Sequence, residues 1–74
     1  MNLQVETRQG MHGDREPVAF MLGERRIEVI QVIDRWLAAD QCYFKITGSD
    51  QATYILQYLL ATREWDMTLF QAPT

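Results

Sequence analysis

The chain has 74 residues, of which 47% are hydrophobic, and its formal net charge is −3. This length allows one domain with a small core, and the hydrophobic content is too high for a disordered protein. No apolar run is long enough to span a membrane, and the polar first ten residues argue against a signal peptide, so a cytoplasmic location is the default expectation. Non-specific phosphate binding needs an excess of cations that neither half of the chain carries.

Residues 1–16 are predicted to form a mobile arm that Pro17 ends. They contain two glycines, many polar side chains and no sustained periodicity, as is typical of a frayed terminus. An arm that binds a partner is the alternative, and Leu3 and Val5 could still add a short edge strand. We therefore place one small β domain at residues 17–71.

The next segment is predicted to form two strands joined by a hairpin. An apolar run over 18–22 is followed by Gly23-Glu24, which suits a two-residue turn. Residues 27–36 are rich in isoleucine and valine, which favour the pleated surface. Their alternation slips once, and a β-bulge near Val29-Ile30 would absorb the slip. A helix through 27–37 is the alternative, but the β-branched content favours the strand.

The segment 52–61 fits two structures. Residues 42–47 before it are predicted to form a short strand that the turn residues 48–51 end. The apolar residues of 52–61 recur at the spacing of an amphipathic helix. As a strand, the same segment would place Tyr54 and Leu56 on one face. Periodicity alone favours the helix.

Residues 65–70 alternate large apolar and polar side chains. Trp65, Met67 and Leu69 fall on one parity, and a period of two is typical of a half-buried strand. If 52–61 is also a strand, the two segments form a hairpin. If it is a helix, this last strand must pair with an earlier one.

Several loose hydrophobic motifs follow one another along residues 17–70. They are Gly23-x-x-Arg26-x-x-Val29-x-x-Val32-Ile33-Asp34-Arg35-Trp36, Tyr43-Phe44-Lys45-Ile46, Tyr54-Ile55-Leu56 and Trp65-Asp66-Met67-Thr68-Leu69. Their order resembles a family of short bacterial domains of unknown function, in which a strand ending in V-x-D-R-W precedes an aromatic strand, Y-x-L and a hairpin into W-x-L. Some members are encoded near error-prone Y-family DNA polymerases or form the tail of larger proteins. The family has no established activity, so no catalytic residues carry over.

The resemblance implies that residues 52–60 and 65–70 form a β-hairpin in an all-β fold. The expected architecture is a small antiparallel meander of about five strands that curls into a partly open barrel and so buries one face. The chain departs from the family at Leu59-Leu60-Ala61, where more polar turn residues are expected. This departure keeps an α+β fold with a helix at 52–61 as the alternative. The expected core comprises Trp36, Phe44, Ile46, Leu56, Trp65, Met67 and Leu69.

Residues capable of nucleophilic or metal chemistry are few, with one serine, one cysteine and one histidine. Ser49 lies in a Gly-Ser-Asp turn without a G-x-S-x-G motif, so a role in the turn is the better account. Cys42 opens an apolar strand as a small buried hydrophobe, and His12 lies in the predicted arm. One histidine and one cysteine cannot supply a closed zinc site. We therefore expect no enzymatic activity, no cofactor and no metal.

Asp34 differs from the other carboxylates, most of which fall in turns or on polar parities. It shares a parity with Val32 and Trp36, so it is predicted to point inward or to lie at a rim. Arg26 or Arg35 could pair with it. A structural ion pair is a better account of Asp34 than a catalytic carboxylate.

Arginine and tyrosine side chains are predicted to share one face of the sheet. Aromatic rings interleaved with cations suit single-stranded nucleic acid, and they suit a protein interface equally well. The alternative is that the arginines pair with Glu24 and Glu28 while the tyrosines cover their neighbours. The candidate interaction face comprises Arg25, Arg26, Arg35, Tyr43, Lys45, Tyr54 and Tyr58.

The sequence thus predicts a non-enzymatic protein-interaction or adaptor module that binds a protein partner or associates with itself. Large apolar residues outnumber those that one sheet face can bury, and surplus apolar surface marks an interface. The surplus residues are Leu37, Ile55, Leu59, Leu60 and Phe70. The alternative function is a nucleic-acid-binding accessory of DNA repair, based on the resemblance and the arginine–tyrosine face. We expect no association with a membrane.

Overall fold

The computed structural model of the protein describes residues 3–9 and 15–72, and this part of the chain forms six β-strands without a helix. The strands are β1 (Val5–Gln9), β2 (Arg15–Leu22), β3 (Arg25–Ala38), β4 (Gln41–Gly48), β5 (Thr53–Leu59) and β6 (Glu64–Gln71). Each strand pairs antiparallel with the next, so the sheet order is β1-β2-β3-β4-β5-β6. The predicted all-β meander is confirmed. The alternative helix at 52–61 is wrong, because β5 occupies that segment.

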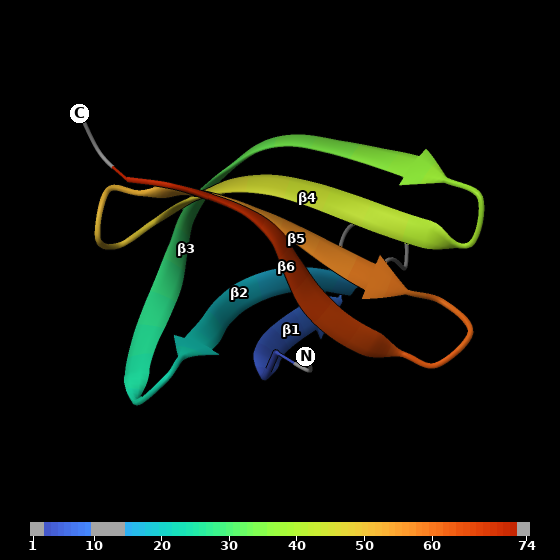
Figure 1. The fold of residues 1–74 in the computed structure, drawn as a ribbon, viewed down its shortest axis with the longest axis horizontal. Helices are drawn as coiled ribbons and strands as arrows, with labels where there is room; N and C mark the ends of the chain where they lie inside the picture. The colour runs from blue at the N-terminus through green and yellow to red at the C-terminus, as the bar shows by residue number, and fades with distance from the viewer. Residues whose placement is uncertain (1–2, 10–14, 73–74) are drawn as a thin grey trace.

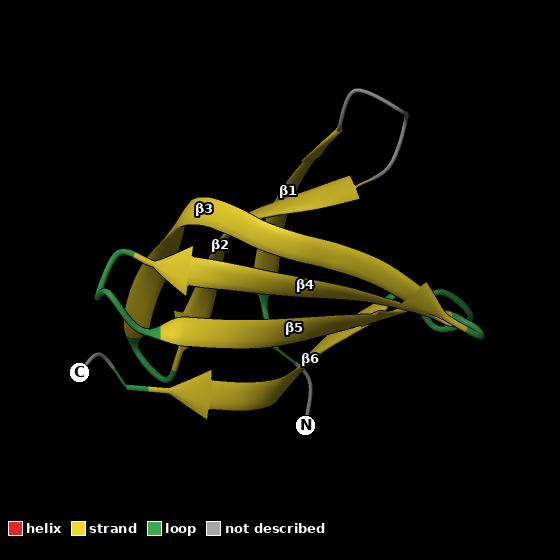
Figure 2. Cartoon of the chain, turned by 90° about the horizontal axis from the view of Figure 1, so that it is seen from above, coloured by secondary structure: helices red, strands yellow, loops and turns green. Residues whose placement is uncertain are grey.

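The sheet curls into a partly open barrel, as predicted (Figure 1). The long strand β3 causes the curl, because it pairs with β2 over Arg25–Glu28 and with β4 over 29–38. In Figure 2, β3 to β6 lie side by side and the β1–β2 hairpin is set at an angle to them. The Leu3 amide donates to the Trp65 carbonyl oxygen at 2.8 Å, and this isolated bridge joins the start of the chain to β6.

The sheet begins inside the segment that was expected to be an arm. β1 pairs with β2 from Val5 opposite Phe20 onward, so the folded part of the chain starts well before Pro17. Val5 forms part of an added edge strand, as the sequence allowed. The strand has a period of two but little hydrophobicity, since Val5 and Thr7 are half-buried and their neighbours are exposed. His12 and the rest of 10–14 lie outside the described residues.

The core lies between the two parts of the curled sheet. Its buried side chains are Ala19, Phe20, Ile27, Phe44, Ile46, Ala52, Tyr54, Leu56 and Trp65. Four of the predicted core residues, Phe44, Ile46, Leu56 and Trp65, are confirmed, and Met67 packs against them partly buried. The prediction is wrong for Trp36 and Leu69, whose side chains are 37% and 42% exposed.

Bulges place Trp36 on the outer face of the sheet. In the β3–β4 pairing, Val29 lies opposite Gly48 and Gln31 opposite Thr47, so Ile30 is an extra residue. This confirms the bulge predicted near Val29-Ile30. Ile33 is a second extra residue, which reverses the alternation again. Asp34 and Trp36 therefore lie on the outer face of the sheet, opposite to the inner face that carries the core.

A bulge in β6 exposes Leu69 in the same way. Met67 pairs with Leu56 on the inner face, but Leu69 pairs with Ile55, so Thr68 is extra. The alternation that begins at Trp65 therefore ends after Met67. Leu69 lies on the outer face, and Phe70 reaches the inner side, where its ring centroid is 5.2 Å from that of Tyr54.

Candidate interaction surface

The structure does not bring the predicted arginine–tyrosine face together. Arg25 and Arg26 lie at the start of β3 beside the two-residue turn that was predicted at Gly23-Glu24. Tyr43 and Lys45 lie on the outer face of β4, whereas Arg35 pairs with Phe44 in register and so belongs to the inner parity. Two other tyrosines point inward. Tyr54 is fully buried, and the Tyr58 ring packs against Trp65 at a centroid distance of 4.8 Å.

Arg26 binds two carboxylates across the first three strands. Its Nε and Nη2 donate to the Glu6 carboxylate at 2.7 and 3.0 Å, and its Nη1 donates to Glu28 Oε1 at 3.0 Å. The Arg26 hydrogen bond holds the pKa of Glu6 below its usual value, and both carboxylates raise the pKa of Arg26. Pairing of Arg26 with Glu28 was the alternative interpretation of this arginine. A cation engaged in this way is a poor ligand for a phosphate.

Tyr54 and Asp50 form a structural pair at the β4–β5 turn. The Tyr54 hydroxyl donates to the Asp50 carboxylate, and the Ala52 amide donates to Asp50 Oδ1 at 3.1 Å. Burial, followed by the bond to Asp50, raises the pKa of Tyr54 to about 12. Burial also acts to raise the pKa of Asp50, but the hydrogen bonds from Tyr54 and the backbone outweigh it, and this pKa lies below its usual value. Tyr54 therefore stabilises the turn and is not available to a ligand.

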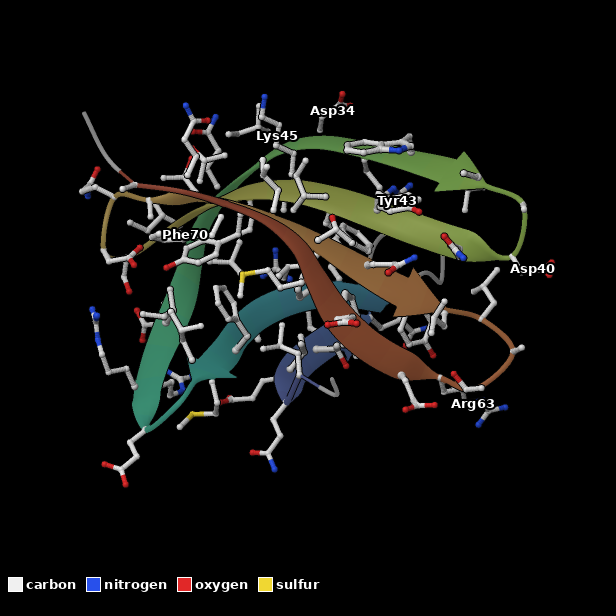
Figure 3. All side chains as sticks on the ribbon, in the orientation of Figure 1. Asp34, Asp40, Tyr43, Lys45, Arg63 and Phe70 are labelled. Atoms are coloured by element: carbon white, nitrogen blue, oxygen red, sulfur yellow. The ribbon has the colours of Figure 1, made fainter. Side chains whose placement is uncertain are left out.

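Asp34 does not point inward as predicted. The bulge at Ile33 places it on the outer face, opposite Lys45 in register, and Figure 3 shows both side chains at the same margin of the sheet. Its Oδ1 accepts a hydrogen bond from the Arg35 amide at 2.8 Å. Arg26, one of its two predicted partners, is bound to glutamates instead.

Ser49 serves the turn, in line with its sequence context. Its amide donates to the Glu28 carbonyl oxygen at 2.8 Å, and its Oγ accepts from the Glu28 amide at 3.1 Å. Cys42 is partly buried and packs against the core. In the described residues, no three histidine, cysteine or carboxylate side chains are grouped so as to hold a metal ion.

Five of the eight large apolar side chains that are exposed in the described residues lie on β3. Every residue from Ile30 to Asp40 is exposed. We define the β3 apolar strip as the large apolar side chains of this segment: Ile30 (58% exposed), Val32 (40%), Ile33 (47%), Trp36 (37%) and Leu37 (72%). The sequence identified Leu37 as surplus but assigned Trp36 to the core. The clue to the strip was the dense β-branched content after the bulge, which one buried face cannot accommodate.

A cleft separates the strip from β2. β2 and β3 diverge after the pair Ala19–Glu28, and the opening between them has a volume of about 260 Å³. Pro17 and Val18 line one wall, and residues 29–32 line the other. Pro17 lacks a backbone donor, so this part of β2 is a poor template for a further strand. The β3 wall carries no proline, glycine or lysine.

On the outer face, Trp36 of the strip is held by contacts with side chains of β4 and β5. The Trp36 and Tyr43 rings stack with their centroids 5.3 Å apart and their planes 11° from parallel. The Tyr43 hydroxyl donates to Gln41 Oε1 at 2.5 Å, and Gln57 Nε2 donates to the same oxygen at 2.6 Å. The Trp36 side chain is therefore fixed on one side while its surface stays partly open to solvent.

Comparison of the chain with protein-family models, curated proteins and solved structures found no match. No helix capable of crossing a membrane occurs in the residues that the structure describes.

Proposed function

We propose that the protein is a non-enzymatic interaction module that binds another protein through the β3 apolar strip. The observation that carries this proposal is the exposure of five large apolar side chains within Ile30–Leu37. By register Val32 and Leu37 lie on the inner parity and Trp36 on the outer one, so the strip exposes apolar side chains on both faces of the strand, and clustered exposed apolar side chains mark interaction sites. A long apolar strand at the edge of a sheet is also a template for pairing with another chain.

The polar side chains support the non-enzymatic part of the proposal. The Ser49 hydroxyl accepts a hydrogen bond from the Glu28 amide of β3, and Asp50 accepts one from the Ala52 amide. Arg26 is engaged with Glu6 and Glu28. Catalytic groups usually lie in a cleft with a nucleophile, a base and a positioning group within reach of one another. The cleft beside β3 is lined mainly by aliphatic side chains, with Arg8 and Glu16 paired at 3.6 Å.

Nucleic-acid binding is the second candidate, based on the resemblance and on the stacked rings of Trp36 and Tyr43 near Lys45. Base stacking on such rings needs cations that follow the phosphate backbone, but Asp34 lies opposite Lys45. The two functions respond differently to salt. Binding of single-stranded DNA that weakens steeply with salt and is lost on Lys45→Ala would favour the second candidate.

The proposal is tested by capture from native cell extract on the immobilised protein. The variant Ile33→Thr/Leu37→Thr removes apolar surface from the strip but keeps the strand propensity. The control Leu60→Thr/Leu69→Thr changes two exposed leucines outside β3, which are 47% and 42% exposed. We expect the first variant to lose the proteins that the wild type retains and the control to keep them. Equal retention by both variants would contradict a binding role for the strip.

A further inference from the structure

We propose that the partner protein presents an arginine side chain to the β3 apolar strip, with the guanidinium stacked on the Trp36 ring and hydrogen-bonded to the Asp34 carboxylate. This inference rests on the proposed function and names the chemistry of the partner. The site consists of an exposed aromatic ring and an exposed carboxylate that lie next to each other on the outer face of β3.

Asp34 and Trp36 project from the same face of one strand. The register with β4 places Asp34 opposite Lys45 and Trp36 opposite Tyr43, all on the outer face. Residues two apart on one face of a strand are separated by about 7 Å. A guanidinium that stacks on the indole can therefore also reach the carboxylate. In Figure 3 the Asp34 side chain points away from the sheet at its margin.

The Trp36 ring is fixed on one face and accessible elsewhere. The Tyr43 ring stacks on it with the centroids 5.3 Å apart and the planes 11° from parallel, yet Trp36 stays 37% exposed. Hydrogen bonds at Gln41 hold the Tyr43 hydroxyl and the Gln57 amide in place. The ring is thus ordered before a ligand arrives, which lowers the entropy cost of binding.

The Asp34 carboxylate has room for a further donor. Its Oδ1 accepts a hydrogen bond from the Arg35 amide at 2.8 Å, and an ionised carboxylate has acceptor sites on both oxygens. Among the described residues, no ion pair involves Asp34, although Lys45 lies opposite it in register. A charged donor from a partner can therefore bind this carboxylate.

The chemistry of the site selects arginine. An indole face attracts cations, and a carboxylate beside it attracts the same ligand. The guanidinium is planar, so it stacks on a ring, and its fork of donors matches a carboxylate. The net charge of −3 attracts a basic partner. Ile33 and Leu37, which are 47% and 72% exposed, offer apolar contacts to the arginine stem and its neighbours.

Lys45 distinguishes an arginine partner from nucleic acid. Its ammonium belongs to the same outer face as Asp34, so it would attract a phosphate and repel a guanidinium. We expect Lys45→Ala to tighten the binding of an arginine peptide by about twofold at low salt. Binding of single-stranded DNA would weaken in the same variant. Weaker binding of the arginine peptide would contradict the proposed position of the guanidinium.

Titration of the isotope-labelled chain with short blocked peptides, followed by NMR, tests the proposal. The probe is acetyl-Gly-Leu-Arg-Leu-Gly-amide. A matched peptide carries citrulline, which has the shape of arginine without its charge. We expect the arginine peptide to shift the amide resonances around Trp36 and the citrulline peptide to bind about tenfold more weakly. Equal binding of the two peptides would overturn the proposal. Tighter binding of a lysine or trimethyl-lysine peptide would overturn the choice of arginine.

Variants of the chain locate the site. Asp34→Asn should weaken the arginine peptide by about threefold and leave the citrulline peptide unchanged. Asp40→Asn is the matched control, because it removes the same charge from an exposed turn carboxylate and should bind nearly like the wild type. Trp36→Leu should weaken binding more than Trp36→Phe, which keeps a ring. Far-UV circular dichroism checks that the variants keep the β fold. Equal effects of Asp34→Asn and Asp40→Asn would overturn the site.

Failure of this proposal is distinguishable from failure of the proposed function. If no arginine peptide bound but Ile33→Thr/Leu37→Thr still lost its proteins from extract, the arginine site would be overturned. The interaction function would then stand with a partner of different chemistry.

Discussion

The two halves of β3 both carry isoleucine and valine side chains, but only the first half buries one of them in the core. Arg25–Val29 contains Ile27, which is 2% exposed, pairs with Phe20 of β2 and packs in the core. From Ile30 to Ala38 every residue is exposed, and β4 alone pairs with the strand. β-Branched content therefore predicts that a segment is a strand, but it does not predict whether the strand is buried. Burial is decided by whether a second layer covers the strand, and here β2 turns away after Glu28.

The largest expected effect on stability comes from a substitution in the buried half of β3. Ile27→Ala should lower the free energy of unfolding by about 2–5 kcal/mol, because it removes core contacts and leaves a cavity. Ile33→Ala in the exposed half should change it by less than about 0.5 kcal/mol. Urea unfolding followed by tryptophan fluorescence measures both at a concentration where the chain is monomeric. Equal losses would show that the two halves are equally packed.

Gly48 offers the next largest effect, because it packs against the buried half of β3. A Cβ at this position would lie 2.7 Å from Ile27 Cγ2 and 2.9 Å from Tyr54 Cε1. Gly48→Ala should therefore cost about 1–3 kcal/mol through overpacking. In the double variant with Ile27→Ala, the clash with Cγ2 disappears. The double variant should therefore lose less unfolding free energy than the sum of the losses of the two single variants. Full additivity in urea unfolding would contradict this contact.

The pH dependence of stability comes from the Tyr54–Asp50 pair, which packs beside the buried half. The pKa of Tyr54 is raised from 10.0 to about 12. The folded state therefore prefers the neutral phenol, and the stabilisation is present below pH 10 and lost as the pH rises towards 12. Unfolding curves at several pH values should show this alkaline loss in the wild type and a smaller one in Tyr54→Phe. An unchanged alkaline slope would contradict the assignment.

Asp50 should affect the pH dependence of the unfolding free energy at acidic pH. Its pKa is lowered from 3.8 in the folded state, so its contribution is present above pH 3.8 and is lost as the pH falls below that value. Asp50→Asn should reduce the acid-side slope of the unfolding free energy against pH. Asp40→Asn removes the same charge at an exposed turn carboxylate and provides the matched variant.

The smallest expected effect on stability comes from the turn that ends the exposed half of β3. Ala39 has a φ of 55° in the β3–β4 turn, a conformation that glycine adopts without steric cost. Ala39→Gly should stabilise the monomer by less than about 1 kcal/mol, because relief of strain exceeds the entropy that glycine loses. Thermal unfolding measures the shift. A decrease in Tm would show that the entropy term is the larger one.

Much of the fold followed from patterns that are local in the sequence. The turn at Gly23-Glu24, the slip near Val29-Ile30 and the strands over 42–47 and 65–70 all depend on neighbouring residues. The segment 52–61 did not follow from its own pattern, since its periodicity favoured a helix. Pairing with β4 and β6 on both sides makes it a strand, because tertiary context overrides helical periodicity.

The errors about the core have one physical cause. Leu69 keeps the sequence parity of Trp65 and Met67, and Trp36 keeps that of Val32 on the inner face, but Thr68 and Ile33 are extra residues in the pairing. A bulge reverses the faces beyond it and arises from the register between two strands. The predicted interaction face failed for a related reason. Tyr43 and Tyr54 are alike in the sequence, but the register of β4 and β5 places Tyr54 in the core and Tyr43 on the outer face. Arg26 is bound to Glu6, a residue of β1 that is distant in the sequence.

The bridge between Leu3 and Trp65 has a consequence for how the chain folds. All other strand pairs join neighbours in sequence, so each hairpin can form as soon as its own residues are free to move, and such local contacts form quickly. The bridge must wait until the last strand exists and pays the loop-closure entropy of nearly the whole chain. We expect this bridge to form last in folding. A chain shortened before β6 should keep its hairpins but cannot form the bridge between Leu3 and Trp65.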